Sequence, residues 1–204
     1  MISVVLVARR GYDGPAVLDP KTAAFVVIDV ETTGLEPEQH RVCEVGAIRL
    51  VGGKEQTRFH TLVQPGCPMS DGARSAHGIT DEMLKDAPPF PKIAADLRQF
   101  LSGSILVAQN AEFDLGFLNA EFLRAGMSKL ALPALDTILL ARRVKPGLPT
   151  YNLDTLAYHF KLKFNSRHRS IGDCEVTGAI FWQCVEALRP RTLEELLKKG
   201  MPRP

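Results

Sequence analysis

The stretch FVVIDVETTG, residues 25–34, decides the fold of this chain. Its apolar residues are mostly β-branched or aromatic, which is typical of a strand buried on both faces at the centre of a sheet. They are Phe25, Val26, Val27, Ile28 and Val30. Asp29 and Glu31 are set into the end of this run. We therefore predict a central strand that ends in two carboxylates.

The two carboxylates share one face of the predicted strand. Successive strand side chains point to opposite faces, so residues 29 and 31 project side by side. Adjacent negative charges at the end of a buried strand repel each other and resist the loss of water, and a divalent cation would relieve both effects. The alternative is a solvated turn, because Thr32, Thr33 and Gly34 are ordinary turn residues. This stretch alone leaves both interpretations open.

Composition indicates one globular domain. The chain has 204 residues, of which 45% are hydrophobic and 24% are charged, which argues against disorder. The net charge of +2 is too small to indicate a nucleic-acid partner, although basic residues gather at 161–169 and at the C-terminus. The cysteines have no paired or zinc-ligand spacing, so we expect reduced thiols in a cytoplasmic protein. They are Cys43, Cys67, Cys174 and Cys184.

Three segments are expected along the chain. Residues 1–20 form an N-terminal extension, in which residues 2–7 could form an edge strand. Residues 21–188 form the folded domain, and residues 189–204 form a short C-terminal helix and tail. The apolar run at 2–7 is too short for a signal peptide, and its basic residues follow rather than precede it. We expect no membrane-spanning segment.

Strands and helices alternate through the domain. Two strands at 42–51 and 56–64 flank Gly52-Gly53, a hairpin signal, and the second strand is expected at a sheet edge. A loop at 65–79 and a short helical segment at 81–85 follow. Further short strands are predicted at 104–108 and 135–137, and helices at 93–101, 112–125, 153–160, 171–188 and 192–200. This order indicates an α/β domain with a mixed sheet, whose ligands favour the carboxyl ends of the strands.

Two further carboxylates begin predicted helices that could lean over the central strand. Asp114 follows a predicted strand, and Asp173 opens the long C-terminal helix. Each has a structural alternative, because Asp114 suits the positive end of a helix dipole and Ser170 with Asp173 could form a capping box. Asn110 could be an N-cap, and His168 could be a surface residue in a basic run.

Taken together, these residues resemble the signature of the DEDDh exonucleases of the ribonuclease H-like superfamily. The pattern is D-x-E at 29–31, N-x-x-x-D at 110–114 and H-x-x-x-x-D at 168–173, with E-V-G-A-I at 44–48 and HGIT at 77–80. The resemblance covers residues 23–188 and is strongest to the proofreading epsilon subunit of bacterial replicative DNA polymerases and its stand-alone relatives. It implies a ribonuclease H-like α/β fold, in which a central mixed five-stranded sheet of order 3-2-1-4-5, with strand 2 antiparallel, is flanked by helices.

Phosphodiester hydrolysis gives a chemical reason for these residue types. Two divalent cations can clamp the attacking and leaving oxygens, and Mg²⁺ prefers oxygen ligands. The resemblance implies two Mg²⁺ or Mn²⁺ ions, with Asp29 bridging them, Glu31 and Asp173 completing the first site and Asp114 holding the second. His168 is the candidate general base, because an imidazole with its ordinary pKa of about 6.5 accepts a proton near neutral pH.

The resemblance also places the terminal nucleotide of the substrate at the turn after the central strand. The substrate-binding residues implied in this way are Thr32, Gly34, Leu35, His77, Asn110 and Phe113. Leu35 would wedge against the last base, and an aromatic face stacks any base, which predicts tolerance of sequence. The alternative is that Leu35 and Phe113 are ordinary apolar residues of a loop and of the core. The basic run around His168 would border this site and could hold backbone phosphates.

We therefore expect a metal-dependent 3′-to-5′ exonuclease that releases nucleoside 5′-monophosphates from single-stranded or frayed DNA. An exoribonuclease similar to ribonuclease T or oligoribonuclease is the first alternative, since the same catalytic set acts on RNA. A non-catalytic nucleic-acid-binding module that docks on a polymerase is the second, because fold does not fix function. Only a short helix and MPRP follow the domain, which favours a stand-alone or repair-type enzyme over a polymerase subunit.

Overall fold

The central stretch forms the strand β1 (Ala24–Thr32) in the computed structural model, which describes residues 19–202. Its apolar side chains alternate between the two faces of the sheet. Phe25 and Val27 pack on one face, Val26 and Ile28 on the other, and all four are at most 1% exposed. The predicted central strand is therefore confirmed.

β1 lies at the centre of a five-stranded mixed sheet of order β3-β2-β1-β4-β5. β2 is antiparallel to both β1 and β3, β4 is parallel to β1, and β5 is parallel to β4. The predicted strand order and the antiparallel second strand are confirmed. The other strands are β2 (Val42–Val51), β3 (Lys54–Leu62), β4 (Ile105–Ala108) and β5 (Ala134–Asp136).

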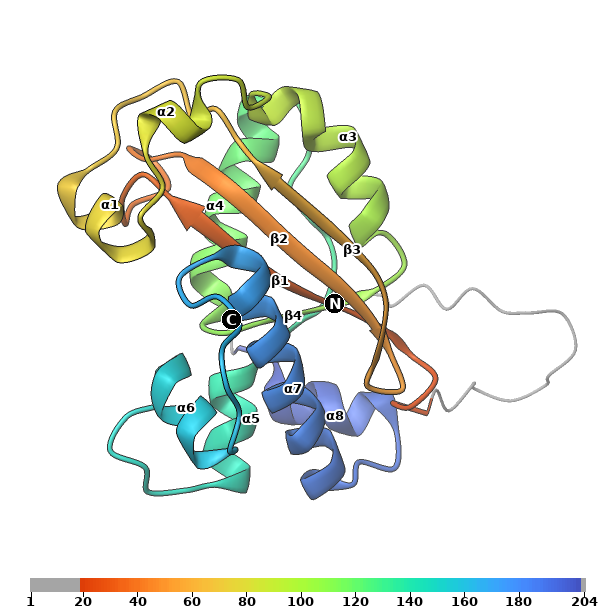
Figure 1. The fold of residues 1–204 in the computed structure, drawn as a ribbon. Coiled ribbons are helices and arrows are strands. Elements are labelled where there is room, and N and C mark those ends of the chain that lie inside the picture. The colour runs from red at the N-terminus through yellow and green to blue at the C-terminus, as the bar shows by residue number, and fades with distance from the viewer. Residues whose placement is uncertain (1–18, 203–204) are drawn as a thin grey trace, which may run out of the picture.

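Helices cover both faces of this sheet (Figure 1). α3 (Phe90–Leu101) and α4 (Ala111–Arg124) pack on the face of Val26 and Ile28. The opposite face is covered by α5 (Thr137–Val144), α6 (Leu153–His159), α7 (Ser170–Leu188) and α8 (Leu193–Gly200). Because odd-numbered residues of β1 face this second group, residues 29 and 31 point toward α7.

A helix interrupts the segment 65–79, which the sequence had indicated to be a loop. It is α1 (Asp71–His77), which begins where Ser70 Oγ accepts the N–H of Ala73 at 3.2 Å and ends at Gly78, whose φ is +69°. Only one residue of α1 is buried, so the helix has no apolar stripe that a periodicity search could find. The predicted short helix beyond it is present as α2 (Asp81–Leu84).

A second unpredicted helix, α5, follows β5 directly. Asp136 Oδ1 accepts the N–H of Ile138 at 2.7 Å and begins the helix, so β5 ends one residue earlier than expected. β3 starts two residues before the predicted position and ends two residues before the predicted end. β3 is largely exposed and lies at the edge of the sheet, as expected.

The suggested edge strand at residues 2–7 lies outside the described residues. Between residues 19 and 202, the structure has no helix that is both long and apolar enough to cross a membrane.

Candidate active site

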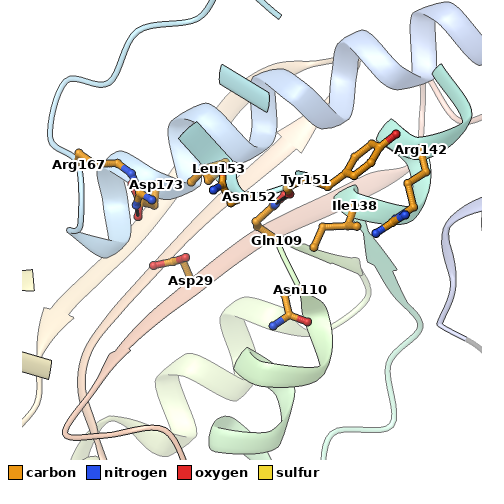
Figure 2. Close-up of a pocket in the computed structure, with 10 residues that line it drawn as sticks. All are labelled: Asp29, Gln109, Asn110, Ile138, Arg142, Tyr151, Asn152, Leu153, Arg167 and Asp173. Atoms are coloured by element: carbon orange, nitrogen blue, oxygen red, sulfur yellow. Dashed lines mark hydrogen bonds and ion pairs between the residues drawn. The ribbon is translucent and has the colours of Figure 1, made fainter. Parts of the chain in front are cut away.

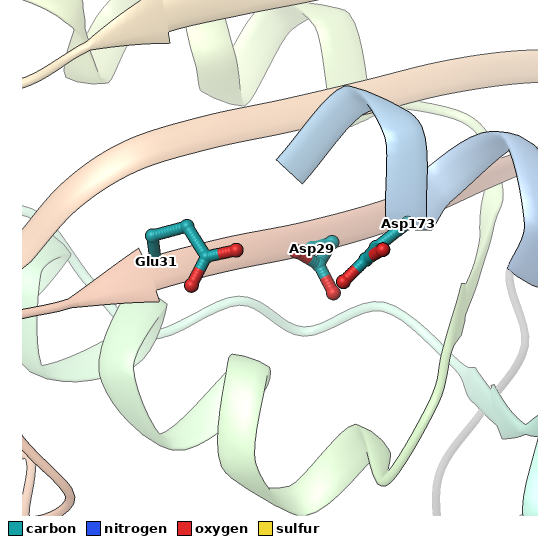
Figure 3. A group of neighbouring side chains, drawn as sticks. All are labelled: Asp29, Glu31 and Asp173. Atoms are coloured by element: carbon teal, nitrogen blue, oxygen red, sulfur yellow. The ribbon is translucent and has the colours of Figure 1, made fainter. Parts of the chain in front are cut away.

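Three carboxylates meet where β1 approaches the first turn of α7. Asp29, Glu31 and Asp173 each place one oxygen within 4.8 Å of an oxygen of the other two. Figure 3 shows the three side chains pointing toward a common space. The shared face of β1 was predicted from alternation along the strand, whereas the approach of α7 depends on how the helix packs on the sheet. The arrangement could hold a metal ion.

The electrostatics of this acidic group favour a bound cation. Burial, followed by the charge of Asp114 and then that of Glu31, raises the pKa of Asp29 well above its usual range. Burial and the charges of Asp173 and Glu44 raise the pKa of Glu31 to about 8. Burial also raises the pKa of Asp173, whose Oδ1 is buried with no hydrogen-bond partner in the described part of the chain. A hard divalent cation would supply both the missing ligand contact and the missing charge.

Asp114 lies beside this group without belonging to it. It is in the first turn of α4, is 3% exposed, and its Oδ1 accepts the N–H of Val30 at 3.0 Å. Burial raises the pKa of Asp114 to about 8, although the hydrogen bond from Val30 opposes the rise. The carboxylate is thus held against the backbone of β1, and its charge acts on Asp29 more strongly than that of any other residue.

The start of α7 differs from the capping box that Ser170 and Asp173 could have formed. Arg169 occupies the N-cap position without a side-chain cap, and Ser170 Oγ has no hydrogen-bond partner among residues 19–202. The structural alternative for Asp173 is therefore wrong. Its carboxylate faces Asp29 and Glu31 instead of closing the end of its own helix.

Glu44 of β2 anchors this end of α7. The side chain is fully buried and accepts hydrogen bonds from Arg169 Nε at 3.1 Å and from the N–H of Ser170 at 2.8 Å, and it lies 2.9 Å from His60 Nε2. Burial alone would raise the pKa of Glu44, but these hydrogen bonds lower it below its usual range. Gly46 allows the approach, because a Cβ there would lie 2.7 Å from the carbonyl carbon of Ser170. E-V-G at 44–46 was the only sequence signal of this contact.

The loop before α7 places Arg167 beside the carboxylates. Arg167 donates from Nε and Nη2 to the two carboxylate oxygens of Asp154, at 2.8 and 3.0 Å, and from Nη1 to Asp173. The His168 side chain is exposed, and its backbone φ is +58°. With Arg169 bound to Glu44, two of the basic residues expected to hold phosphates are paired with acids of the domain.

The proposed wedge residue follows β1 and is open to solvent. Leu35 is 79% exposed, and the turn before it is closed by Thr32 Oγ1, which donates to the carbonyl of Gly34 at 2.6 Å. His77 lies beneath this turn, with Nε2 3.2 Å from the carbonyl oxygen of Thr32, and Nδ1 accepts the N–H of Ile79. Burial lowers the pKa of His77, which favours the neutral ring that these contacts need. The structure thus gives His77 a supporting position under the turn.

Asn110 is the N-cap residue of α4, and Phe113 lies in the first turn of this helix. Asn110 has a φ of +63°, and its side chain makes no capping hydrogen bond, so the N-cap alternative does not account for its amide group. Phe113 is partly buried and lies 5.0 Å, centroid to centroid, from the ring of Phe117. Phe113 thus packs against the core and keeps part of its side chain exposed.

A buried ion pair holds the loop that carries the wedge residue. Glu121 of α4 is 1% exposed, and its carboxylate accepts from Arg41 Nε at 2.6 Å, from Arg41 Nη2 at 2.9 Å and from Arg124 Nη1 at 3.1 Å. Arg124 also donates to the carbonyl oxygens of Pro37 and Glu38. The loop between β1 and β2 is thereby fastened to α4.

An open cavity of about 460 Å³ extends from the acidic group along the carboxyl ends of β1, β4 and β5 (Figure 2). Its volume falls in the ~300–1,000 Å³ range of ligand pockets. Polar side chains and a few apolar ones line it: Asp29, Gln109, Asn110, Ile138, Arg142, Tyr151, Asn152, Leu153, Arg167 and Asp173. A ligand in this cavity would touch two of the three clustered carboxylates.

The sequence model of the RNase_T exonuclease family matches residues 26–181, which include all the carboxylates described above. The chain belongs to this exonuclease family. The predicted membership is thus confirmed. The exonuclease domain is also 37% identical to DNA polymerase III PolC-type of Oceanobacillus iheyensis over 174 residues, and 34% identical to that of Caldanaerobacter subterraneus subsp. tengcongensis over 193 residues. These matches cover 85% and 91% of this chain but only 12% and 14% of the two polymerases.

Solved structures agree with this assignment. Exonuclease X in complex with 5′ overhanging duplex DNA is 28% identical, with a TM-score of 0.68, over 85% of this chain and 98% of that protein. E. coli exonuclease I in complex with a dT13 oligonucleotide has a TM-score of 0.74 over 82% of this chain and 42% of that protein. Because the second is only 18% identical, it supports the fold alone.

Proposed function

We propose that this exonuclease domain hydrolyses phosphodiester bonds from the 3′ end of single-stranded or frayed DNA and releases nucleoside 5′-monophosphates, as in proofreading or repair. The observation that carries the proposal is the group of Asp29, Glu31 and Asp173, whose oxygens lie within 4.8 Å of one another beside Asp114. An acidic group with raised pKa values, open to a cavity, suits a reaction on a phosphate that needs cations.

The residues present fit a pair of hard divalent cations such as Mg²⁺ or Mn²⁺. Asp29, Glu31 and Asp173 would hold the first, and the unpartnered Oδ1 of Asp173 is a free ligand atom for it. Asp114, beside Asp29, would help to hold the second. Bound cations of this kind lower the pKa of water and stabilise charge on the attacking and leaving oxygens. Arg167 donates to the other oxygen, Oδ2, of Asp173 and leaves Oδ1 free for the cation.

His168 is the proposed proton acceptor: its side chain is exposed, and its charge opposes the rise that burial causes in the pKa of Asp173. A φ of +58° is unfavourable for a residue with a Cβ, so this loop conformation carries a small conformational cost. The N–H of Ser170 and the guanidinium of Arg169 are bound to Glu44, which fixes the start of α7 beside this loop. Replacing His168 by Ala should then slow turnover much more than it weakens substrate binding.

DNA is the proposed substrate because the relatives are DNA polymerases and exonuclease X was solved with DNA. An exoribonuclease remains the rival within the same chemistry. Comparing DNA and RNA strands of equal sequence decides between them, since faster trimming of RNA would overturn the assignment of DNA. A polymerase partner and a cytoplasmic location belong to this proposal and rest on the same relatives.

The test uses single strands labelled at either end. A 5′-labelled strand should give a ladder that shortens from the 3′ end, whereas a 3′-labelled strand should release labelled mononucleotide at once. Activity should require Mg²⁺ or Mn²⁺ and vanish in excess chelator and in Asp29→Ala. Cleavage that survives the chelator, or labelled fragments longer than one nucleotide from the 3′-labelled strand, would contradict the proposal. Binding without cleavage would favour the non-catalytic module instead.

A further inference from the structure

Arg142 stands at one end of the cavity whose other end is formed by Asp29 and Asp173 (Figure 2). It lies on α5 and is exposed, and within residues 19–202 it makes no ion pair with an acidic side chain. The charge of Arg142 acts on Asp136: burial raises the pKa of Asp136, and the nearby positive charge of Arg142 opposes this rise. The carboxylate of Asp136 is already used by backbone N–H groups, among them that of Ile138.

A fixed aromatic platform orients Arg142. Its guanidinium carbon lies 4.4 Å from the ring centroid of Tyr151, a distance typical of a cation–π contact. Tyr151 is only 9% exposed, its hydroxyl donates to the carbonyl of Lys145 at 2.8 Å, and its own carbonyl accepts from Gln109 Nε2 at 2.7 Å. A ring held at both ends keeps the guanidinium at the cavity, while its N–H donors remain available to a ligand.

The position of the cavity relates Arg142 to the direction of a bound strand. The lining includes Asp29 and Asp173, but neither Glu31 nor residues 32–35. The cavity therefore begins at the acidic group and extends away from the turn that carries Leu35. If the 3′-terminal nucleotide lies at that turn and the scissile phosphate at the carboxylates, the nucleotides on the 5′ side enter the cavity.

We infer that Arg142 binds a backbone phosphate of the substrate strand on the 5′ side of the scissile bond. This inference rests on the proposed function. Guanidinium groups bind phosphate oxygens through paired, charge-assisted hydrogen bonds, and a phosphate contact positions a strand without reading its sequence. Asn110 and Asn152 add amide groups to the same cavity, and Ile138 and Leu153 add apolar wall for sugars or bases. The positive charge of Arg142 thus offsets part of the repulsion between the acidic group and an anionic strand.

The next residue provides a matched control. Arg143 is also exposed on α5, but its Nε donates to the carbonyl of Lys199 in α8 at 2.9 Å, and it does not line the cavity. Arg142→Gln and Arg143→Gln therefore remove the same charge from neighbouring positions of one helix. Because both side chains are exposed, neither change should unfold the domain, and circular dichroism would verify this.

Two substrates separate the proposed subsite from the carboxylates. Thymidine 5′-(p-nitrophenyl phosphate) offers a terminal nucleotide whose leaving group replaces the rest of the strand, whereas a short oligothymidylate carries phosphates on the 5′ side. In Arg142→Gln, kcat/KM for the oligonucleotide should fall relative to that for the nitrophenyl ester by about tenfold, mainly through KM. The slope of log KM against log salt should decrease by about 0.7 for one lost phosphate contact on a single strand. In Arg143→Gln, the ratio of kcat/KM for the oligonucleotide to kcat/KM for the nitrophenyl ester should equal that of the parent protein. In Arg142→Lys, this ratio should lie between those of the parent protein and Arg142→Gln.

The outcomes distinguish this inference from the proposed function. Equal losses on both substrates, or no loss on either, would overturn the phosphate subsite while leaving the exonuclease assignment in place. If the parent protein hydrolyses neither substrate, the proposed function fails. Fluorescence anisotropy with a labelled oligothymidylate in chelator then measures the subsite directly. A Kd for Arg142→Gln equal to that of the parent protein would overturn it, and a Kd about tenfold higher would support it.

Discussion

Glu31 and Glu44 are cross-strand partners in the antiparallel pair β1–β2. Their side chains have opposite electrostatic surroundings, because Glu31 faces Asp173 with a raised pKa and Glu44 receives Arg169 and Ser170 with a lowered one. The Glu31 carboxylate is thus suited to binding a cation from solution. The Glu44 carboxylate is neutralised by groups of the protein itself. The pair links the acidic group to the start of α7 through adjacent positions of the sheet.

Removing the Glu44 side chain should loosen the start of α7. In Glu44→Ala, the guanidinium of Arg169 and the N–H of Ser170 lose their acceptor, and we expect a loss of about 2–3 kcal/mol in the free energy of unfolding. Urea unfolding monitored by fluorescence measures it. The matched control is Glu55→Ala, which breaks an exposed pair with Arg58 and should cost less than about 1 kcal/mol. Equal losses in the two variants would contradict the anchoring role.

Neutralising Asp29 should raise the stability of the metal-free protein and abolish its activity. Asp29→Asn removes a charge that Asp114 and Glu31 repel, so the metal-free protein should gain about 1–2 kcal/mol in unfolding free energy. The same change should abolish metal-dependent hydrolysis. Thermal unfolding in chelator and release of label from a 3′-labelled strand measure the two effects. Asp96→Asn on the exposed side of α3 should change neither, and a destabilised Asp29→Asn would show that the acidic group is not under repulsion.

The metal-free protein should become less stable as pH rises. The folded-state pKa values of Glu31 and Asp114 are both about 8, above the ordinary values of 4.5 and 3.8. The folded state therefore binds protons more tightly than the unfolded state, and this stabilisation is present at low pH and is lost as pH rises from about 4.5 to about 8. Tm in chelator should fall across this range, while the increase in Tm caused by Mg²⁺ should grow. A constant effect of Mg²⁺ from pH 5 to 8 would contradict a cation site at these acids.

Glu121→Gln should release the loop between β1 and β2. The neutral amide cannot form the ion pairs with Arg41 and Arg124 that fasten the loop to α4, so amide exchange should quicken at Thr33 and Arg41. Hydrogen exchange followed by mass spectrometry measures this change. Glu194→Gln removes an exposed pair with Lys198 in α8 and should leave exchange of the loop unaltered. Unchanged exchange in Glu121→Gln would mean that contacts other than those to the Glu121 carboxylate hold the loop.

Much of the fold could be predicted from local patterns in the sequence. Alternation in residues 25–31 identified the central strand and placed Asp29 and Glu31 on one face, and helical spacing identified α3, α4, α6 and α7. α1 was missed because only one of its residues is buried, and α5 was missed because its start at Thr137 was assigned to the preceding strand. The possible capping box at the start of α7 was wrong because Ser170 and Asp173 both turn to tertiary surroundings.

By itself, the sequence determined the central strand, the paired carboxylates at its end and the exonuclease family, because strand alternation and ordered motifs are properties of consecutive residues. Only the tertiary structure decided which side chains support the carboxylates of the site. Glu44 and Ser170 are 126 positions apart, and Val30 and Asp114 are 84 apart. Likewise, the placement of Arg167 beside Asp173, of His168 in solvent and of Arg142 at the cavity depends on how α5, α6 and α7 pack on the sheet. Long-range packing sets these contacts, and no local pattern in the chain encodes them.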